Sequence, residues 1–359
     1  MTQEKKKPAI RLHILLLVIL ALVVGVIVWL FQDSRTGLPY ECTNQAMGTY
    51  AQQTVYGETG EEAATNAAQT LGALESLISW REENSDIARL NENAGVDWIS
   101  IQDVTFRLLG QCMDVAEASG GAFDPTILPL TRLWDFDGDK KQVPAQEEID
   151  RFLPYVGYEN LRLEEGTAGA SLKMHGNAVD LGAAGKGAAC DAMIAAYEKT
   201  GGVTGAVVAV GGSVGVYGKK NDGSDWVIAV RDPQRSLEEE GGAQLGTLTI
   251  PDGFLSTSGS YEKCFTKDGV LYHHILDPRT GYPADSGLLS VTVYADSGAM
   301  SDILSTACFV LGLEDGLELI KEFGAQAILV DTQNHVYVTQ GLTGLFELTA
   351  QGYTLQEAG

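Results

Sequence analysis

Apolar residues recur every three or four positions in several segments of the chain. In residues 59–80, one such stripe consists of Ala63, Ala67, Leu71, Leu74 and Ile78. This spacing corresponds to one face of an α-helix. Similar stripes, several of them followed by glycine, predict further helices at residues 103–118, 146–152, 186–199, 302–311 and 316–323.

Other short segments are rich in β-branched and aromatic residues and predict strands. They cover residues 205–210, 214–217, 226–230, 244–250, 270–275, 288–294, 327–330 and 336–338. Several follow one another at the spacing of hairpins, with predicted helices before and after them. This order is typical of an α+β fold with largely antiparallel sheets and flanking helices.

The N-terminus has a different pattern. Basic residues at positions 5, 6, 7 and 11 precede an uncharged apolar stretch from Ile14 to Phe31. At about 1.5 Å per residue, a helix of this length just spans a bilayer core. The basic flank predicts a cytoplasmic N-terminus. A cleaved signal peptide is the alternative, but the stretch is longer than usual for one and is followed by Asp33 and Arg35.

We therefore expect an uncleaved, single-pass anchor in the cytoplasmic membrane, with the rest of the chain on the extracytoplasmic side. The expected organisation is a basic cytoplasmic tail at 1–11, a transmembrane signal anchor at 12–31, a linker at 32–44, one folded domain at 45–345 and a C-terminal tail at 346–359.

The charge of the chain excludes one class of function. It has 48 acidic and 24 basic residues, a net charge of −24, and the basic N-terminus makes the remainder still more acidic. Such a surface repels nucleic acid, and an anionic ligand would need a local cation. The five cysteines show no CxxC spacing and indicate neither a zinc site nor a disulfide framework.

Asp302 and Thr306 lie four residues apart in a predicted helix, so their side chains would share one face. A carboxylate and a hydroxyl without a neighbouring cysteine suit Mg²⁺ better than zinc or copper. Mg²⁺ usually takes few protein carboxylates and completes its shell with water and phosphate, so this pair favours a phosphate-bearing substrate. Alternatively, Asp302 and Thr306 belong to an ordinary helix surface or to a helix cap.

Two glycine-rich segments resemble nucleotide-binding loops but fail on spacing. Residues 182–187 lack the first glycine of a P-loop and have no Ser or Thr after Lys186, and residues 210–218 contain no GxGxxG. We interpret Asp180 as the end of an extended segment and Lys186 as lying near a helix start, where backbone amides can bind an anion. The alternative is a simple glycine-rich connection.

Six motifs occur in order along the chain: AMGT (46–49), GAFDPT (121–126), VDLGAAGKG (179–187), LSTSGSYEK (255–263), YHHILDPRTG (272–281) and DILST (302–306). This set resembles the ApbE family of FAD:protein FMN transferases, from about Met47 to about Val330. The resemblance implies a two-lobed, T-fold-related domain, here residues 45–345, with the nucleotide held in a cleft between the lobes.

The resemblance also implies the roles of individual residues. FAD would be the substrate, with Mg²⁺ at its pyrophosphate held by Asp302, Thr306 and the Ala183 carbonyl. His274, aided by Asp302, would be catalytic and would activate the acceptor hydroxyl. The implied nucleotide contacts are Met47, Trp80, Ala122, Phe123, Asp124, Asp180, Lys186, Ser258, Gly259 and Ile275.

Several of these residues have a structural alternative. Met47 and Trp80 would otherwise be packing residues, and Asp124 a turn cap. Because successive strand residues face opposite sides, only one of His273 and His274 can face the cleft, and the motif selects His274; a structural histidine is the alternative. The segments also depart from the family pattern, with Ser213 for the usual Asn, Lys263 for the usual Arg and Gly185 for the usual Ala.

The implied reaction is transfer of FMN from FAD to a threonine or serine hydroxyl of an acceptor protein, with release of AMP. Acceptors would be flavin-carrying subunits of membrane redox complexes or FMN-binding domains of exported reductases. Two alternatives stay open: an FAD pyrophosphatase that forms FMN and AMP, and a flavin-binding surface protein without turnover. The presence of Asp302, Thr306 and His274 favours an enzyme.

Overall fold

The computed structural model describes residues 38–235 and 243–358. The predicted membrane anchor at residues 12–31 lies outside these ranges. Within them, no helix combines the length and the apolar composition needed to cross a bilayer.

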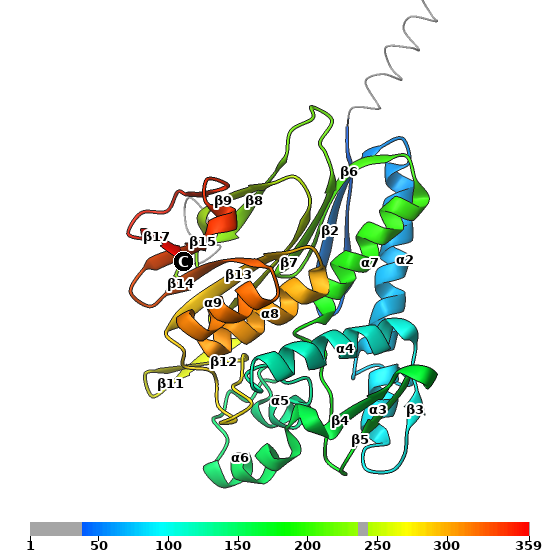
Figure 1. Ribbon diagram of the computed structural model, residues 1–359, viewed down its shortest axis with the longest axis vertical. Helices are drawn as coiled ribbons and strands as arrows, with labels where there is room; N and C mark the ends of the chain where they lie inside the picture. Colours follow the sequence, from blue (N-terminus) through cyan, green and yellow to red (C-terminus); the bar gives the residue numbers. More distant parts are fainter. Residues whose placement is uncertain (1–37, 236–242, 359) are drawn as a thin grey trace, which may run out of the picture.

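A large antiparallel sheet forms the centre of the upper lobe (Figure 1). Within the described ranges it has nine strands in the order β1-β2-β6-β7-β10-β13-β14-β15-β17, and the final pair, β15 and β17, is parallel. The strands are β1 (Tyr40–Ala46), β2 (Thr49–Gly57), β6 (Val203–Val210), β7 (Ser213–Gly218), β10 (Gly253–Gly259), β13 (Leu288–Ala295), β14 (Gln326–Asp331), β15 (His335–Thr339) and β17 (Thr354–Ala358).

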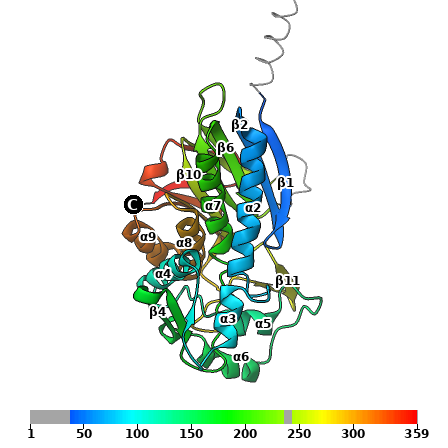
Figure 2. The ribbon, with the colours of Figure 1, turned by 90° about the vertical axis from the view of Figure 1, so that its right-hand side faces the viewer.

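Both faces of this sheet are covered. Helices lie on one face (Figure 2): α2 (Gly60–Ile78), α7 (Gly185–Thr200), α8 (Gly298–Leu311) and α9 (Leu313–Glu322). The other face packs against a small sheet of β16 (Phe346–Leu348), β9 (Gln244–Ile250) and β8 (Trp226–Arg231). Strand β14 shows the consequence, because Ala327 and Leu329 belong to the helix-side core while Ile328 and Val330 belong to the core beneath the small sheet.

The lower lobe is made of short elements (Figure 1). Its helices are α3 (Asp86–Glu92), α4 (Asp103–Ala118), α5 (Leu128–Trp134) and α6 (Gln146–Phe152), and its sheet is formed by β3 (Ile99–Ser100), β5 (Gly169–Leu172) and β4 (Leu161–Glu164). Four 3₁₀ helices within the described residues are η1 (Leu153–Tyr155), η2 (Tyr158–Asn160), η3 (Glu165–Thr167) and η4 (Gln340–Leu342).

A hairpin of β11 (Cys264–Lys267) and β12 (Val270–His273) joins the two lobes. Its Phe265 and Tyr272 stack on each other, and they reach the rings of Phe136 and Trp134 at centroid distances of 5.6 and 5.7 Å. Aromatic pairs at such distances add to the stabilisation that burial gives. The hairpin is thereby fixed on the α5 region, and residues at its base are held at the boundary between the lobes.

The predicted α+β class and the predicted helices agree with the structure, but the domain boundaries differ. Strand β1 begins at Tyr40, inside the expected linker, and β16 and β17 lie within residues 346–359, expected to be a tail. Strands β1 and β17 are the edges of the central sheet, so their side chains are mostly exposed and they lack the apolar pattern of a central strand. The strand predicted over 270–275 ends at His273.

We expect strand β17 to contribute to stability rather than to form a free tail. A chain that ends at Tyr353 loses the pairing of five residues with β15. At about 1 kcal/mol for each backbone hydrogen bond, this loss should lower the free energy of unfolding by about 2–4 kcal/mol in urea denaturation. A chain that ends at Ala358, and so keeps all of β17, is the control, and equal stability of the two chains would show that β17 is dispensable.

Candidate active site

A cavity of about 960 Å³ lies between the two lobes. Loops of the lower lobe form one wall, and the ends of the central strands together with the starts of α7 and α8 form the other. All residues predicted from the sequence to serve the site line this one cavity: Met47, Trp80, Ala122, Phe123, Asp124, Asp180, Ala183, Lys186, Ser258, Gly259, His274, Ile275, Asp302 and Thr306.

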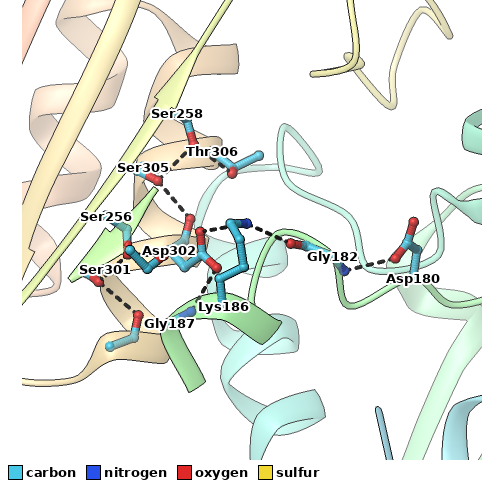
Figure 3. Close-up of polar contacts among 12 residues, drawn as sticks. Asp180, Gly182, Lys186, Gly187, Ser256, Ser258, Ser301, Asp302, Ser305 and Thr306 are labelled. Atoms are coloured by element: carbon cyan, nitrogen blue, oxygen red, sulfur yellow. Dashed lines mark hydrogen bonds and ion pairs between the residues drawn. The ribbon is translucent and has the colours of Figure 1, made fainter. Parts of the chain in front are cut away.

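Helix α8 places Asp302 and Thr306 on the same side, as the four-residue spacing predicts (Figure 3). The Asp302 side chain is only 3% exposed. Its Oδ2 accepts a hydrogen bond from the Gly187 amide at 3.0 Å, and its Oδ1 lies 3.4 Å from Lys186 Nζ. The Thr306 hydroxyl lies 3.0 Å from the Ser258 hydroxyl on β10. The pair is thus held at the bottom of the cavity by groups from two other elements.

The glycine-rich segment forms the turn into α7, which begins at Gly185. The Gly182 amide donates to Asp180 Oδ1 at 2.8 Å, and Lys186 Nζ donates to the Gly182 carbonyl at 3.0 Å (Figure 3). Lys186 is therefore bound to the turn on one side and to Asp302 on the other. The positive end of the α7 dipole, together with this ammonium group, can accept an anion.

The turn before α7 and the cavity-facing side of α8 carry groups that fit a Mg²⁺ ion. Asp302 offers a carboxylate, Thr306 a hydroxyl and Ala183 a backbone carbonyl, and all three residues line the cavity. Over residues 38–235 and 243–358, no cluster of three His, Cys, Asp or Glu side chains could hold a metal. One carboxylate with neutral oxygens is typical of Mg²⁺, which keeps several positions for water and phosphate. The ammonium of Lys186 beside Asp302 shows that this carboxylate attracts a cation.

The two adjacent histidines point to opposite sides. His274 lines the cavity, whereas the buried His273 lies 3.1 Å from the Ala284 carbonyl and packs edge-on against Phe309. His274 Nδ1 lies 3.1 Å from the Glu262 carbonyl. Because a carbonyl can only accept, Nδ1 carries the hydrogen and Nε2 keeps its lone pair. Burial, and then the charge of Lys186, lower the pKa of His274 to about 4, so His274 is neutral at pH 7.

Trp80 contacts two guanidinium groups. Those of Arg81 and Arg132 lie 4.1 and 4.7 Å from its ring centroid, which is the range of cation–π attraction. Asp137 in turn binds Arg81 at 2.9 Å and Lys263 at 2.8 Å. The sequence had suggested Trp80 as a stacking residue, but nothing in the local pattern of Arg81, Arg132 or Asp137 indicated that they would meet there.

The AFD segment of the lower lobe also reaches the cavity. Asp124 accepts hydrogen bonds from the Thr126 amide at 2.7 Å and the Thr126 hydroxyl at 2.6 Å, and that hydroxyl accepts from the Gly157 amide. Burial raises the pKa of Asp124 to about 6. The residue therefore caps the turn that follows, as the structural alternative expected, and lines the cavity as well.

Glu75 is a cavity residue that the sequence did not reveal. Met47 occupies the tight turn between β1 and β2 with φ 52°, a left-handed conformation that is uncommon for a side chain other than glycine. Its amide donates to Glu75 Oε1 at 2.6 Å. Glu75 lies next to the apolar stripe of α2, and this pattern predicts a side chain that faces solvent. It instead fixes the turn that brings Met47 to the cavity.

Comparison with known proteins decides the family. The model of the ApbE family matches residues 47–329. This chain belongs to the ApbE family. It is 30% identical over 321 residues to the FAD:protein FMN transferase of Treponema pallidum (strain Nichols), which covers 84% of this chain and 87% of that protein. A FAD:protein FMN transferase of Klebsiella pneumoniae (strain 342) is 32% identical over 263 residues, 73% of this chain and 79% of that protein.

Solved ApbE structures have the same fold. The ApbE protein from Thermotoga maritima matches with a TM-score of 0.77 and 30% identity, over 86% of this chain and 99% of that one. The flavin transferase ApbE from Vibrio cholerae matches with a TM-score of 0.75 and 25% identity, again over 86% and 99%. This ApbE protein is accordingly an enzyme of the transferase class with an α+β fold of antiparallel sheets and helices.

The lowered pKa of His274 gives a pH dependence. The unfolded chain protonates this residue near pH 6.5, but the folded protein does so only near pH 4, so the unfolded state binds more protons in between. Stability should therefore fall as pH decreases from about 6.5 to about 4, and His274→Gln should remove this part of the loss. Imidazole NMR titration, with the variant to assign the resonance, checks the pKa; a midpoint near 6.5 would contradict it.

Proposed function

We propose that this protein is a Mg²⁺-dependent FAD:protein FMN transferase, which moves FMN from FAD to a threonine or serine hydroxyl of an acceptor flavoprotein and releases AMP. One observation carries the proposal. A single cavity holds the buried Asp302 beside Thr306 and Lys186, and the neutral His274 lines the same cavity. The names of the relatives in Treponema pallidum and Klebsiella pneumoniae support the same reaction.

Each group of the site has its own role in the proposed reaction. Asp302, Thr306 and the Ala183 carbonyl would hold Mg²⁺, which when bound neutralises charge on phosphate oxygens. Lys186, at the positive end of α7, binds the pyrophosphate. His274 accepts the proton of the acceptor hydroxyl at Nε2, since Nδ1 is bound to the Glu262 carbonyl. The hydroxyl oxygen then bonds to the FMN phosphorus, the bond to the bridging oxygen breaks, and AMP leaves.

We also propose that the domain works at the outer face of the cytoplasmic membrane, held by the anchor at residues 12–31. Strand β1 begins at Tyr40, with only eight residues between it and Phe31. Even fully extended, this connection reaches at most about 30 Å. The domain would therefore stay close to the membrane, where subunits of membrane redox complexes and FMN-binding domains of exported reductases are the expected acceptors.

Intact-mass spectrometry tests the reaction. An acceptor flavoprotein domain is incubated with FAD, Mg²⁺ and the full-length protein in detergent, and we expect a mass gain equal to FMN on an acceptor threonine or serine. EDTA should abolish the gain. Free FMN and AMP with every acceptor unlabelled would indicate the FAD pyrophosphatase instead, and bound but unchanged FAD would indicate a flavin-binding protein without turnover.

Asp302→Asn tests the metal site. The variant keeps the shape of the side chain but removes the charge that would bind Mg²⁺, so FMN transfer should fall by about 100-fold or more, equivalent to a few kcal/mol in the barrier. FAD binding in EDTA, followed by flavin fluorescence, should persist. Asp315→Asn, at an exposed position on α9, removes the same charge away from the cavity and is the control. Wild-type transfer by Asp302→Asn would refute the assignment.

A further inference from the structure

Asp191 lies on α7, is not among the residues that line the cavity, and binds the start of α8. Its carboxylate accepts hydrogen bonds from the Gly298 amide at 2.7 Å, the Ala299 amide at 2.8 Å and the Ser297 hydroxyl at 3.2 Å. The first amides of a helix have no partner within the helix. In α8 the Gly298 and Ala299 amides are met by a side chain from α7, while the Met300 amide donates to Ser297, so the start of α8 is tied to α7.

The backbones of α7 and α8 also touch at this point. A methyl group added at Gly187 would overlap the Gly298 carbonyl oxygen, and one added at Gly298 would overlap the Gly187 carbonyl oxygen. The Gly187 amide also donates to Asp302 Oδ2 at 3.0 Å. Only glycine allows this approach, so the distance between the two helices is set at these two positions.

The spacing along α8 links this contact to the cavity. Gly298, Asp302 and Thr306 follow one another at four-residue intervals, so they form one line along a single face of the helix. Asp191 holds the first turn, and Asp302 and Thr306 lie one and two turns further on. A small rotation or shift at Gly298 would therefore move both side chains relative to Lys186 and the Ala183 carbonyl on the α7 side.

We propose that Asp191 is a positioning residue of this site: by binding the start of α8, it sets where Asp302 and Thr306 stand relative to the Ala183 carbonyl. This inference rests on the proposed metal-dependent function. It predicts a specific defect. Without the Asp191 carboxylate, metal binding weakens, while FAD binding in the absence of metal changes little because Asp191 does not reach the cavity.

The structure offers a matched control in Asp86. This buried aspartate on α3 accepts from the Gln102 amide and the Thr105 hydroxyl at 2.8 Å each, at the start of α4, and from Arg89 at 2.6 Å. It too ties the start of a following helix, here with two hydrogen bonds, but it is not among the cavity-lining residues. Asp86→Ala should therefore cost stability without a specific effect on metal binding.

The experiment measures Mn²⁺ binding to the full-length protein in detergent by EPR, which detects the free ion. We expect Asp191→Ala to raise the Kd for Mn²⁺ about tenfold, Asp191→Asn to raise it less because its amide oxygen still accepts, and Asp86→Ala to leave it unchanged. The Kd for FAD in EDTA should stay within about twofold in all variants. If Asp191→Ala fails to fold, the Kd of Asp191→Asn for Mn²⁺ tests the proposal in its place.

The outcomes separate this inference from the proposed function. Wild-type protein that binds no Mn²⁺ and transfers no FMN would overturn the metal-dependent function, and the role of Asp191 with it. Wild-type protein that binds Mn²⁺, together with Asp191 variants that bind it no less tightly than Asp86→Ala, would overturn the role of Asp191 alone.

Discussion

The burial of one carboxylate, that of Asp302, is the constraint on which the site depends. A buried charged group needs hydrogen-bond donors or an opposite charge, or its burial costs several kcal/mol. Here the donor is the Gly187 amide and the opposite charge is Lys186. Both come from the first turn of α7, so α7 and α8 must meet at their starts. The glycines at 187 and 298 allow that approach, so packing accounts for the glycine at position 187 of the glycine-rich segment.

The other side of α8 is held to the central sheet by hydroxyl groups. Ser256 on β10 lies 2.8 Å from Ser301, and Ser258 lies 2.8 Å from Ser305, all of them buried side chains (Figure 3). Hydrogen bonds between buried hydroxyls have defined directions, whereas apolar contacts tolerate sliding. The helix that carries the proposed metal ligands is therefore fixed in register against β10. Thr306 also contacts Ser258, so the same set of hydroxyl contacts orients its side chain.

The sequence was sufficient for features that follow from local periodicity. The four-residue spacing placed Asp302 and Thr306 together. His273 and His274 face opposite sides as predicted, although β12 ends at His273. Contacts between distant segments could not be predicted in this way: the Met47 amide meets Glu75 across 28 positions, and Asp191 meets Gly298 across 107. The edge strands β1 and β17 were missed for another reason. Their side chains are mostly exposed, so nothing in the hydrophobic pattern marks them as strands.

The charge distribution has a consequence for the proposed reaction. The chain carries a net charge of −24, and the cavity is lined by acidic side chains as well as by Arg81, Arg132, Lys186 and Lys263. An anionic dinucleotide is repelled by the outer surface, and these basic side chains act on it only at close range, within about a Debye length of 8–10 Å. Long-range electrostatics therefore do not speed the association of FAD, or of an acidic acceptor, with the protein. Confinement to a membrane surface would offset this by raising the local concentration of the acceptor, so the proposed anchor and the acidic surface are best understood together.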